Sequence, residues 1–249
     1  MKVVSTTGLV LILVFGIVVI TDDAQARSRH SSGSYSSRST SGTFQRNVNK
    51  SQGSATNETT WQNQRGQGSY KTQRNWDKSS GTGTYSSTLK TAGGKTATQS
   101  GTVVKNDDGS YTQNGTITGP AGKTSTVDRN YTENDDGSRT VDTVYTGQEG
   151  KTLTVNKDIT HEDGALNVSG DYSTSTGKSG TFNGTTTVED GQVITNRSLT
   201  NQDGKTWGQD VVVDRDGNTV TRQVTDTDPW GKSYSFNESV AIENVTVEK

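Results

Sequence analysis

Apolar and polar residues alternate along most of the chain after residue 94, with a period of two. Leu153, Val155 and Ile159 share one parity, while Thr152 and Thr154 occupy the other. Successive side chains of a β-strand point to opposite faces, so this pattern predicts strands with one apolar and one polar face. Thr, Asn and Gly dominate the rest of these segments and are weak helix formers, so we expect no helix there.

Turn signals separate these strands at regular intervals. Gly-Lys pairs begin at positions 94, 122, 150, 177, 204 and 231, which are 27 or 28 residues apart, and Asp-Gly pairs lie between them. Asp and Gly accept the left-handed backbone that tight hairpin turns require. A fixed period of this length is typical of repeat proteins. The sequence therefore predicts an all-β fold built from tandem 27–28-residue β-hairpin repeats.

The hairpins can continue as an antiparallel meander or stack in parallel as a solenoid. Stacking would place the lysines of successive Gly-Lys turns about 4.8 Å apart, whereas a meander separates them by two strands, about 9.5 Å. Charge repulsion therefore favours an extended, twisted antiparallel meander. Its apolar face then needs a cover, which we expect from the sheet curling on itself, from the N-terminal region or from a second copy.

Residues 1–26 have the pattern of a secretory signal peptide. Lys2 precedes an apolar segment from Leu9 to Ile20, and Ala24-Gln25-Ala26 fits a cleavage site after Ala26. An uncleaved membrane anchor is the alternative reading of the apolar segment. The chain contains no cysteine, and an exported chain without disulfides suggests a bacterial periplasmic, surface or secreted protein.

Charge is distributed unevenly along the remaining chain. Residues 27–95 contain eleven Lys and Arg against two acids, whereas residues 96–249 contain thirteen against twenty-three. We expect residues 27–37 to be a disordered Ser/Arg-rich tail, because they are of low complexity. We expect residues 38–93 to form basic, degenerate or loosely ordered repeats, because they contain few large apolar residues. Residues 94–249 form the predicted hairpin array.

One unit of the chain resembles a known repeat family. Asp216-Gly217-Asn218, followed by Thr225-Asp226-Thr227-Asp228-Pro229-Trp230-Gly231, is similar to the turn pattern of bacterial YD/Rhs-type hairpin repeats. The resemblance implies an exported β-hairpin array at the cell surface. The Tyr-Asp dipeptide of those repeats is absent here, the period is longer, and the chain is too short to build an enclosing shell.

No pattern indicates a metal, a cofactor or catalysis. Asp214 and Asp216 are the strongest calcium candidates, but they lack the further acids of a complete calcium loop, and a hairpin turn explains them equally well. Nucleophilic catalysis would need a Ser or Thr beside a His, but the two histidines, His30 and His161, lie in the tail and in a turn, and nothing places a partner carboxylate against His161. We therefore predict a protein that is not an enzyme.

The basic N-terminal third offers the best binding residues. Cationic side chains alternate there with tryptophans, a mixture that contacts acidic polymers through charge and stacking. The candidate polyanion-binding residues are Arg46, Lys50, Trp61, Arg65, Lys71, Arg74, Trp76 and Lys78. A solvated flexible segment is the alternative interpretation, and export argues against a specific nucleic acid as the partner.

The sequence thus predicts an exported bacterial structural or interaction protein of the cell surface or extracellular matrix, without catalytic activity. One alternative is a carbohydrate- or polyanion-binding module that also uses Trp207 and Trp230, and another is a self-assembling, amyloid-like fibre subunit. We expect no membrane span after signal cleavage. A lipid-embedded barrel is disfavoured because the more apolar face still carries Gln99, Arg129, Arg139, Lys157 and Arg197.

Overall fold

The computed structural model describes residues 27–36 and 40–248. The predicted signal peptide, residues 1–26, and its cleavage site after Ala26 lie outside the described residues. Residues 37–39, at the end of the predicted tail, lie outside them as well.

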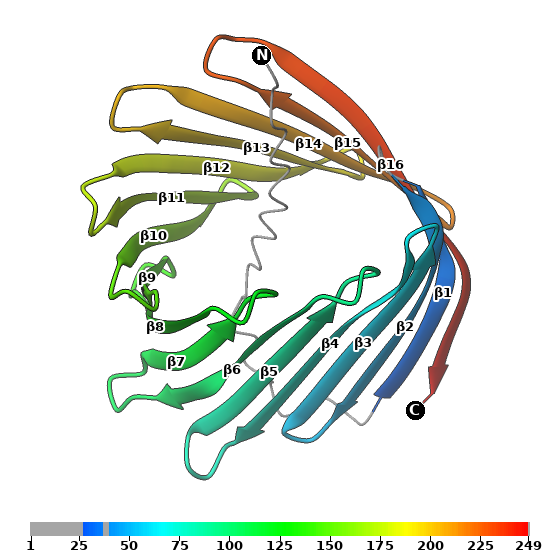
Figure 1. Cartoon of the computed structure of the whole chain (residues 1–249), viewed down its shortest axis with the longest axis horizontal. Coiled ribbons are helices and arrows are strands. Elements are labelled where there is room, and N and C mark those ends of the chain that lie inside the picture. The colour runs from blue at the N-terminus through cyan, green and yellow to red at the C-terminus, as the bar shows by residue number, and fades with distance from the viewer. Residues whose placement is uncertain (1–26, 37–39, 249) are drawn as a thin grey trace.

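The described chain consists of sixteen antiparallel strands joined by turns (Figure 1). Each strand pairs with the next one along the chain, so the predicted antiparallel meander is confirmed. The strands are β1 (Arg27–Ser36), β2 (Ser41–Ser51), β3 (Ser54–Asn63), β4 (Gly66–Asp77), β5 (Thr82–Lys90), β6 (Thr96–Lys105), β7 (Tyr111–Thr118), β8 (Thr124–Glu133), β9 (Arg139–Thr146), β10 (Thr152–Glu162), β11 (Ala165–Thr174), β12 (Ser179–Glu189), β13 (Gln192–Asn201), β14 (Thr206–Asp216), β15 (Thr219–Thr227) and β16 (Ser233–Glu248).

The meander closes into a barrel, and the expectation of an open, extended sheet is wrong. Strand β1 pairs with β2 on one side and with β16 on the other, from Ser28 opposite Glu248 to Ser36 opposite Ser239. Closure gives the main-chain N–H and C=O groups of both terminal strands a partner, which an open sheet would leave unpaired. These hydrogen bonds belong to the main chain, and the side-chain pattern of the sequence does not report them.

Strands also cover the N-terminal third. Strand β1 occupies most of the segment for which we expect a disordered tail, and β2 to β5 occupy the segment expected to hold loosely ordered repeats. Few of their side chains are large and apolar, but sheet pairing uses main-chain groups that every residue except proline carries in full. In the closed sheet these strands lie between β6 and β16.

Glycine with a positive φ marks each turn from the one after β2 to the one before β16. In the turn between β6 and β7, the Asn106 N–H donates to the Ser110 carbonyl, and the Gly109 N–H donates to the Asn106 carbonyl. Gly109 has a φ of 85° there, a conformation that residues with a Cβ rarely adopt. The predicted Asp-Gly turns are therefore present; that the hairpins are equivalent repeats stays a prediction.

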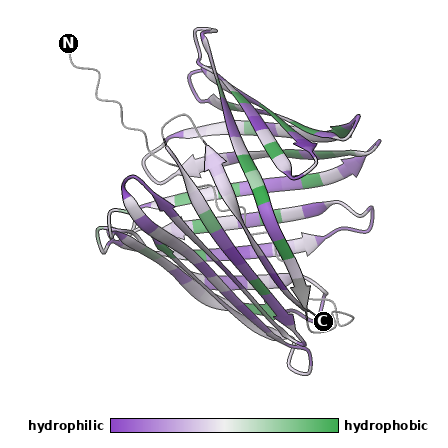
Figure 2. Ribbon diagram, turned by 90° about the vertical axis from the view of Figure 1, so that its right-hand side faces the viewer, coloured by the Kyte–Doolittle hydropathy of each residue, from purple (hydrophilic) through white to green (hydrophobic). Residues whose placement is uncertain are grey.

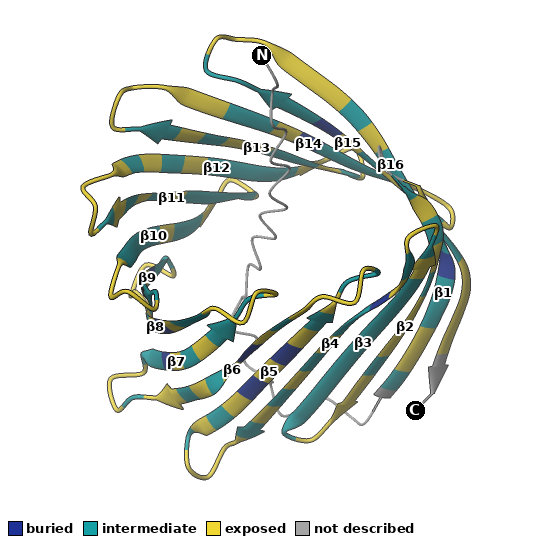
Figure 3. Ribbon diagram, in the orientation of Figure 1, coloured by how far each residue is buried: buried dark blue, intermediate teal, exposed yellow. Residues whose placement is uncertain are grey.

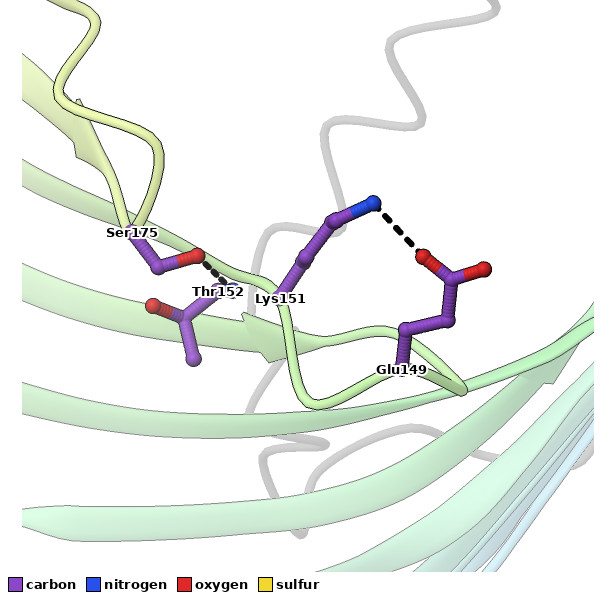
Figure 4. A network of polar contacts seen from close by, with 4 residues as sticks. All are labelled: Glu149, Lys151, Thr152 and Ser175. Atoms are coloured by element: carbon purple, nitrogen blue, oxygen red, sulfur yellow. Dashed lines mark hydrogen bonds and ion pairs between the residues drawn. The ribbon is translucent and has the colours of Figure 1, made fainter.

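Neighbouring turns at one end of the barrel are connected to each other. The Thr152 N–H at the start of β10 donates to the Ser175 hydroxyl at 2.9 Å, and the Ser175 N–H donates to the Thr152 carbonyl at 3.0 Å. Lys151 and Glu149 form an ion pair at 2.6 Å in the same turn (Figure 4). Both of these charged side chains are exposed, so the ion pair contributes little to stability.

The two faces of the sheet differ in chemistry. Residues directly opposite each other on paired strands share a face, and this relation runs around the whole ring. We call the face that contains Val127, Tyr145 and Leu153 the apolar face, and the other the polar face. Figure 2 shows the resulting alternation along the strands. The predicted period of two is thus the basis of the sheet.

Burial is confined to the apolar face. Its buried hydrophobic residues are few, namely Tyr85, Val127, Val141, Val211 and Val224. Most turn residues are exposed, and the buried positions lie within strands (Figure 3). A barrel of eight strands is narrow enough for side chains to fill, whereas sixteen strands enclose a much wider space.

Aromatic side chains on the apolar face lie opposite glycines on the adjacent strand. The positions suit each other because a large ring covers backbone that glycine leaves exposed, as in the aromatic rescue of strand glycines. The hydroxyl of Tyr85 lies against both Gly101 and Gly115. The directly paired examples are Tyr35–Gly42, Phe44–Gly33, Trp61–Gly68, Trp76–Gly83, Tyr85–Gly101, Tyr172–Gly180 and Phe182–Gly170.

Candidate functional site: a basic, aromatic face of the sheet

The predicted polyanion-binding residues are divided among three places. Arg46, Lys50, Trp61, Arg74 and Trp76 all lie on the apolar face. Lys50 and Arg74 are opposite the same residue of β3, Ala55, so they are two strands apart in one row. The structure therefore brings five of these residues together on one surface.

The other three predicted residues lie away from that surface. Lys71 is on the polar face, directly opposite Glu58 on β3. Arg65 lies in the turn before β4, and Lys78 lies in the turn after it. These three exposed residues provide a comparison set with the same charge in different positions.

Charged strand residues are sorted by face around the whole ring. Cations predominate on the apolar face, and acids predominate on the polar face. The apolar face carries Arg29, Arg46, Lys50, Arg74, Lys105, Arg129, Arg139, Lys157, Arg197, Arg215 and Arg222, together with the acids Glu133, Asp226 and Glu238. The polar face carries Glu58, Asp77, Asp128, Asp142, Asp158, Glu162, Asp171, Glu189, Asp210, Asp214 and Asp216, together with Lys71, Lys90 and His30.

The acids of the apolar face are held by neighbours on adjacent strands. Glu133 pairs with Arg139 at 3.8 Å, and Glu238 pairs with Arg222 at 2.8 Å. Asp226 accepts a hydrogen bond from the Gln209 side-chain amide at 2.9 Å. The remaining cations give this face a positive balance, while the polar face has a negative one.

Arg129 has the most elaborate surroundings of these cations. Its Nε donates to the Thr143 hydroxyl at 3.0 Å, one terminal nitrogen lies 3.5 Å from Gln113 Oε1, and the other lies 3.3 Å from the Tyr145 hydroxyl. These three acceptors are neutral, and they come from β7 and β9 on either side of β8. Thr143 and Gln113 are themselves buried. The plane of the guanidinium is thus set by three strands.

Lys157 on β10 belongs to the same cluster. It lies directly opposite Val141 of β9, which in turn lies opposite Tyr131 of β8. Its ammonium group is half-buried, and burial lowers the pKa of Lys157, with the positive charge of Arg129 lowering it further. Desolvation and a like charge both disfavour the protonated form of an amine.

Aromatic rings continue this cluster toward the N-terminal third. The ring centroids of Trp76 and Tyr111 are 6.1 Å apart, and those of Tyr111 and Tyr131 are also 6.1 Å apart. These separations lie within the range of favourable aromatic pairs. The series links a residue predicted from the sequence, Trp76, with the Arg129 and Lys157 cluster.

We call Arg129, Lys157, Trp76, Tyr111 and Tyr131 the cationic cluster. The sequence already placed Arg129 and Lys157 on the more apolar face, but only as an argument against contact with lipid. The signal for this placement was their position in the alternating pattern of their strands. Their proximity to the tryptophan of β4 depends on the register of six successive strand pairs, from β4–β5 to β9–β10.

A cleft lined mainly by residues of the polar face lies over β13 to β16 and the end of β1. Its volume is about 490 Å³, and its lining includes Gln192, Asp214, Gln223 and Asn237. Asp214 therefore lines a cleft, whereas the second calcium candidate, Asp216, is exposed at the end of β14. Within residues 27–36 and 40–248, no group of three or more acidic or histidine side chains is placed to hold a metal ion.

The two histidines are far apart in the chain and lie on different faces. His30 is on the polar face, where its Nδ1 contacts the Asn47 side-chain oxygen. His161 is exposed near the end of β10, on the apolar face opposite Leu166.

The remaining tryptophans lie away from the cationic cluster. Trp207 is on the apolar face of β14 and is partly exposed, whereas Trp230 is 79% exposed in the turn before β16. The ammonium group of Lys205 lies 5.8 Å from the centroid of the Trp230 ring.

Comparison with known proteins gives no relative for this chain: no family model, no curated protein and no solved structure matches it. In the part of the chain that the structure describes, no helix is long and apolar enough to cross a membrane.

Proposed function

We propose that this protein is an exported, non-catalytic bacterial scaffold of the cell surface or matrix, which binds an acidic polysaccharide through its basic, aromatic apolar face. The sorting of charge by face carries the proposal. Eleven cationic strand residues lie on the face that also holds the aromatic rings. Only two of those described above, Lys71 and Lys90, lie on the polar face. Export rests on the predicted signal peptide.

Several arrangements support a binding role over the alternatives. Arg46, Lys50 and Arg74 share one surface with Trp61 and Trp76, so charge and aromatic contacts are available to one polymer. Polyanion binding through several cations releases counterions and depends strongly on salt. The described histidines have neutral or exposed surroundings, which favours binding over catalysis.

Closure of the sheet disfavours a fibre subunit that grows by edge pairing. Such growth adds a strand to an unpaired edge, and β1 and β16 use their edges on each other. Neither face of the sheet suits lipid, because cations such as Arg129 and Lys157 lie within the apolar face and Thr, Asn and Asp fill the polar one.

A charge-matched pair of triple variants tests this proposal. One variant combines Arg46→Gln, Lys50→Gln and Arg74→Gln on the apolar face, and the other combines Arg65→Gln, Lys71→Gln and Lys78→Gln. Retention on an immobilised polygalacturonate column is measured over a range of NaCl concentrations. We expect the first variant to elute at lower salt, with a salt-dependence slope reduced by roughly one unit for each lost contact.

The second variant has the same net charge as the first and should elute close to the unmodified protein. Equal losses of retention in both variants would mean that retention depends on net charge and not on where the charges lie. Full retention of both variants would contradict binding through this face. Replacing Trp61 and Trp76 by Ala should weaken retention further, since stacking contributes about 1–3 kcal/mol for each ring in comparable nucleic-acid complexes.

A further inference from the structure

The cationic cluster has the features of one defined binding position within the larger apolar face. Arg129 and Lys157 come from β8 and β10, and Tyr131 and Val141 lie between or beside them in the sheet. All of these cationic and aromatic side chains are partly exposed, so a ligand can reach them. The neighbouring residues Gln113, Val127 and Thr143 are buried.

We propose that Arg129 and Lys157 form a subsite for a single oxyanion, the carboxylate or sulfate ester of one sugar unit, with the sugar ring against Tyr131 and Tyr111. This subsite rests on the proposed function and specifies the chemical group that the apolar face recognises. It also identifies two residues outside the basic N-terminal third as the centre of recognition.

The geometry of Arg129 supports an oxyanion as the ligand. A guanidinium group presents planar, paired N–H donors that match the oxygens of a carboxylate or sulfate. Thr143, Gln113 and Tyr145 orient this group from both neighbouring strands. A binding group that its neighbours already orient loses little conformational entropy when the ligand arrives.

The surroundings of Lys157 favour the same ligand. The charged and titratable groups on this part of the apolar face are Arg129, Tyr131 and Glu133 on β8, Arg139 and Tyr145 on β9, His161 on β10 and Tyr172 on β11. Glu133 is occupied by its ion pair with Arg139. An anion close to Lys157 and Arg129 offsets their mutual repulsion and favours the charged ammonium group, so binding raises the lowered pKa of Lys157.

A series of aromatic rings leads from the subsite toward the basic N-terminal third. Tyr131 is on the same strand as Arg129, and Tyr111 and Trp76 follow at centroid separations of 6.1 Å each. A polymer anchored at Arg129 can therefore continue along these rings toward Arg74 and Lys50 on the same face. The subsite and the basic N-terminal third then bind successive parts of one chain.

The test compares variants by calorimetric titration. Protein purified after expression of the full chain is titrated with oligogalacturonate, with sulfated dextran and with neutral dextran. Arg129→Gln and Lys157→Gln should each weaken binding by about tenfold or more, the range expected for a lost hydrogen bond to a charged group. Lys90→Gln removes the same charge from the polar face, outside the proposed binding face, and should change the affinity less than twofold.

The ligands identify the group that is bound. Preference for oligogalacturonate assigns the carboxylate, and preference for sulfated dextran assigns the sulfate ester. Binding of neutral dextran with equal affinity would overturn the oxyanion subsite. If the unmodified protein binds an acidic polymer but the Arg129 and Lys157 variants match Lys90→Gln, the subsite is wrong and the proposed function stands. If the unmodified protein binds no acidic polymer, the proposed function fails too.

A second measurement uses the unmodified protein and does not depend on how the variants fold. The lysine side-chain carbon signals are followed by NMR between pH 8 and 11, with the Lys157 signal identified by through-bond assignment to its neighbours in the chain. We expect the pKa of Lys157 to be lower than that of an ordinary lysine and to rise when saturating oligogalacturonate or sulfated dextran is present. An unchanged pKa with both bound polymers would overturn the subsite.

Discussion

At the scale of single residues, glycines and aromatic rings act as pairs on the apolar face. The Tyr85 ring is buried and directly opposite Gly101, and its hydroxyl reaches the next glycine in the row, Gly115. A side chain at either glycine would occupy space that the ring already fills. The sequence shows both residue types in the strands, but the pairing depends on register, which shifts every contact when it slips by one residue.

Replacing Gly101 by Ala should therefore destabilise the barrel. Its Cβ would come closer than 3.0 Å to both the Asn114 carbonyl oxygen and the Tyr85 hydroxyl, so the strand or the ring must move. We expect the free energy of unfolding, measured by urea denaturation, to fall by about 1–3 kcal/mol. Gly184→Ala on the same face, where a Cβ meets no atom closer than 3.5 Å, is the matched control. A similar loss in both variants would show that packing against Tyr85 is not the cause.

At the scale of elements, the hairpin is the unit that the sequence specifies most directly. In the turn between β8 and β9, the Asn134 N–H donates to the Ser138 carbonyl, and the Gly137 N–H donates to the Asn134 carbonyl. The Ser138 N–H donates to the Asp136 carboxylate at 2.8 Å, and Ser138 lowers the pKa of Asp136 by hydrogen bonding. These hydrogen bonds of the turn are therefore made between residues of the turn itself and do not involve distant strands.

Gly137→Ala should destabilise this turn through the backbone alone. Gly137 has a φ of 78°, and a Cβ there meets no atom within 4 Å, so the cost comes from the left-handed conformation and not from a clash. That cost is roughly 1–2 kcal/mol, and a lower midpoint of thermal unfolding should report it. Gly119→Ala, in the turn before β8 at a position without positive φ, should have a much smaller effect. Equal destabilisation by the two variants would contradict this account.

At the scale of the whole molecule, the pairing of β1 with β16 closes the sheet and so arranges the other strands around a ring. It places the basic N-terminal third beside the C-terminal strands, and it gives the sheet two continuous faces around a ring. Charges that alternate along each strand are thereby collected on opposite surfaces. The proposed binding face is a property of this closed arrangement.

A pair of introduced cysteines tests closure directly. Ser34 on β1 lies opposite Ala241 on β16, and directly paired residues have Cα atoms about 4.5–5.5 Å apart, within the range of a disulfide. The natural chain contains no cysteine, so Ser34→Cys with Ala241→Cys can form only one bridge within a molecule. We expect an intramolecular crosslink on oxidation, seen by faster migration on a non-reducing gel.

The control pairs Ser34→Cys with Thr116→Cys on β7, which is well separated from β1 in the strand order and should form no such bridge. Crosslinked dimers in place of the internal bridge would indicate that β1 pairs with another copy. That result would contradict closure of the barrel within one chain and would revive the fibre alternative.

The sequence could predict which face carries several residues of the candidate site, but it could not predict which of them lie close together. Parity alone placed Arg129 and Lys157 on the more apolar face, because side chains alternate along strands. Grouping them required the offset between successive strands, which the turns and the main-chain hydrogen bonds set. Lys71 illustrates the same point: it belongs to the basic segment by composition, yet it lies on the polar face opposite Glu58.

Over residues 94–249, the sequence by itself determined the strands, the hairpin turns and the division of each strand into an apolar and a polar side, because these depend on residues close together in the chain. Only the tertiary structure decided that the sheet closes and that Arg27–Ser36 becomes its first strand. Both depend on main-chain groups of β1 meeting those of β16, more than 200 residues away, and no local pattern of side chains records that contact.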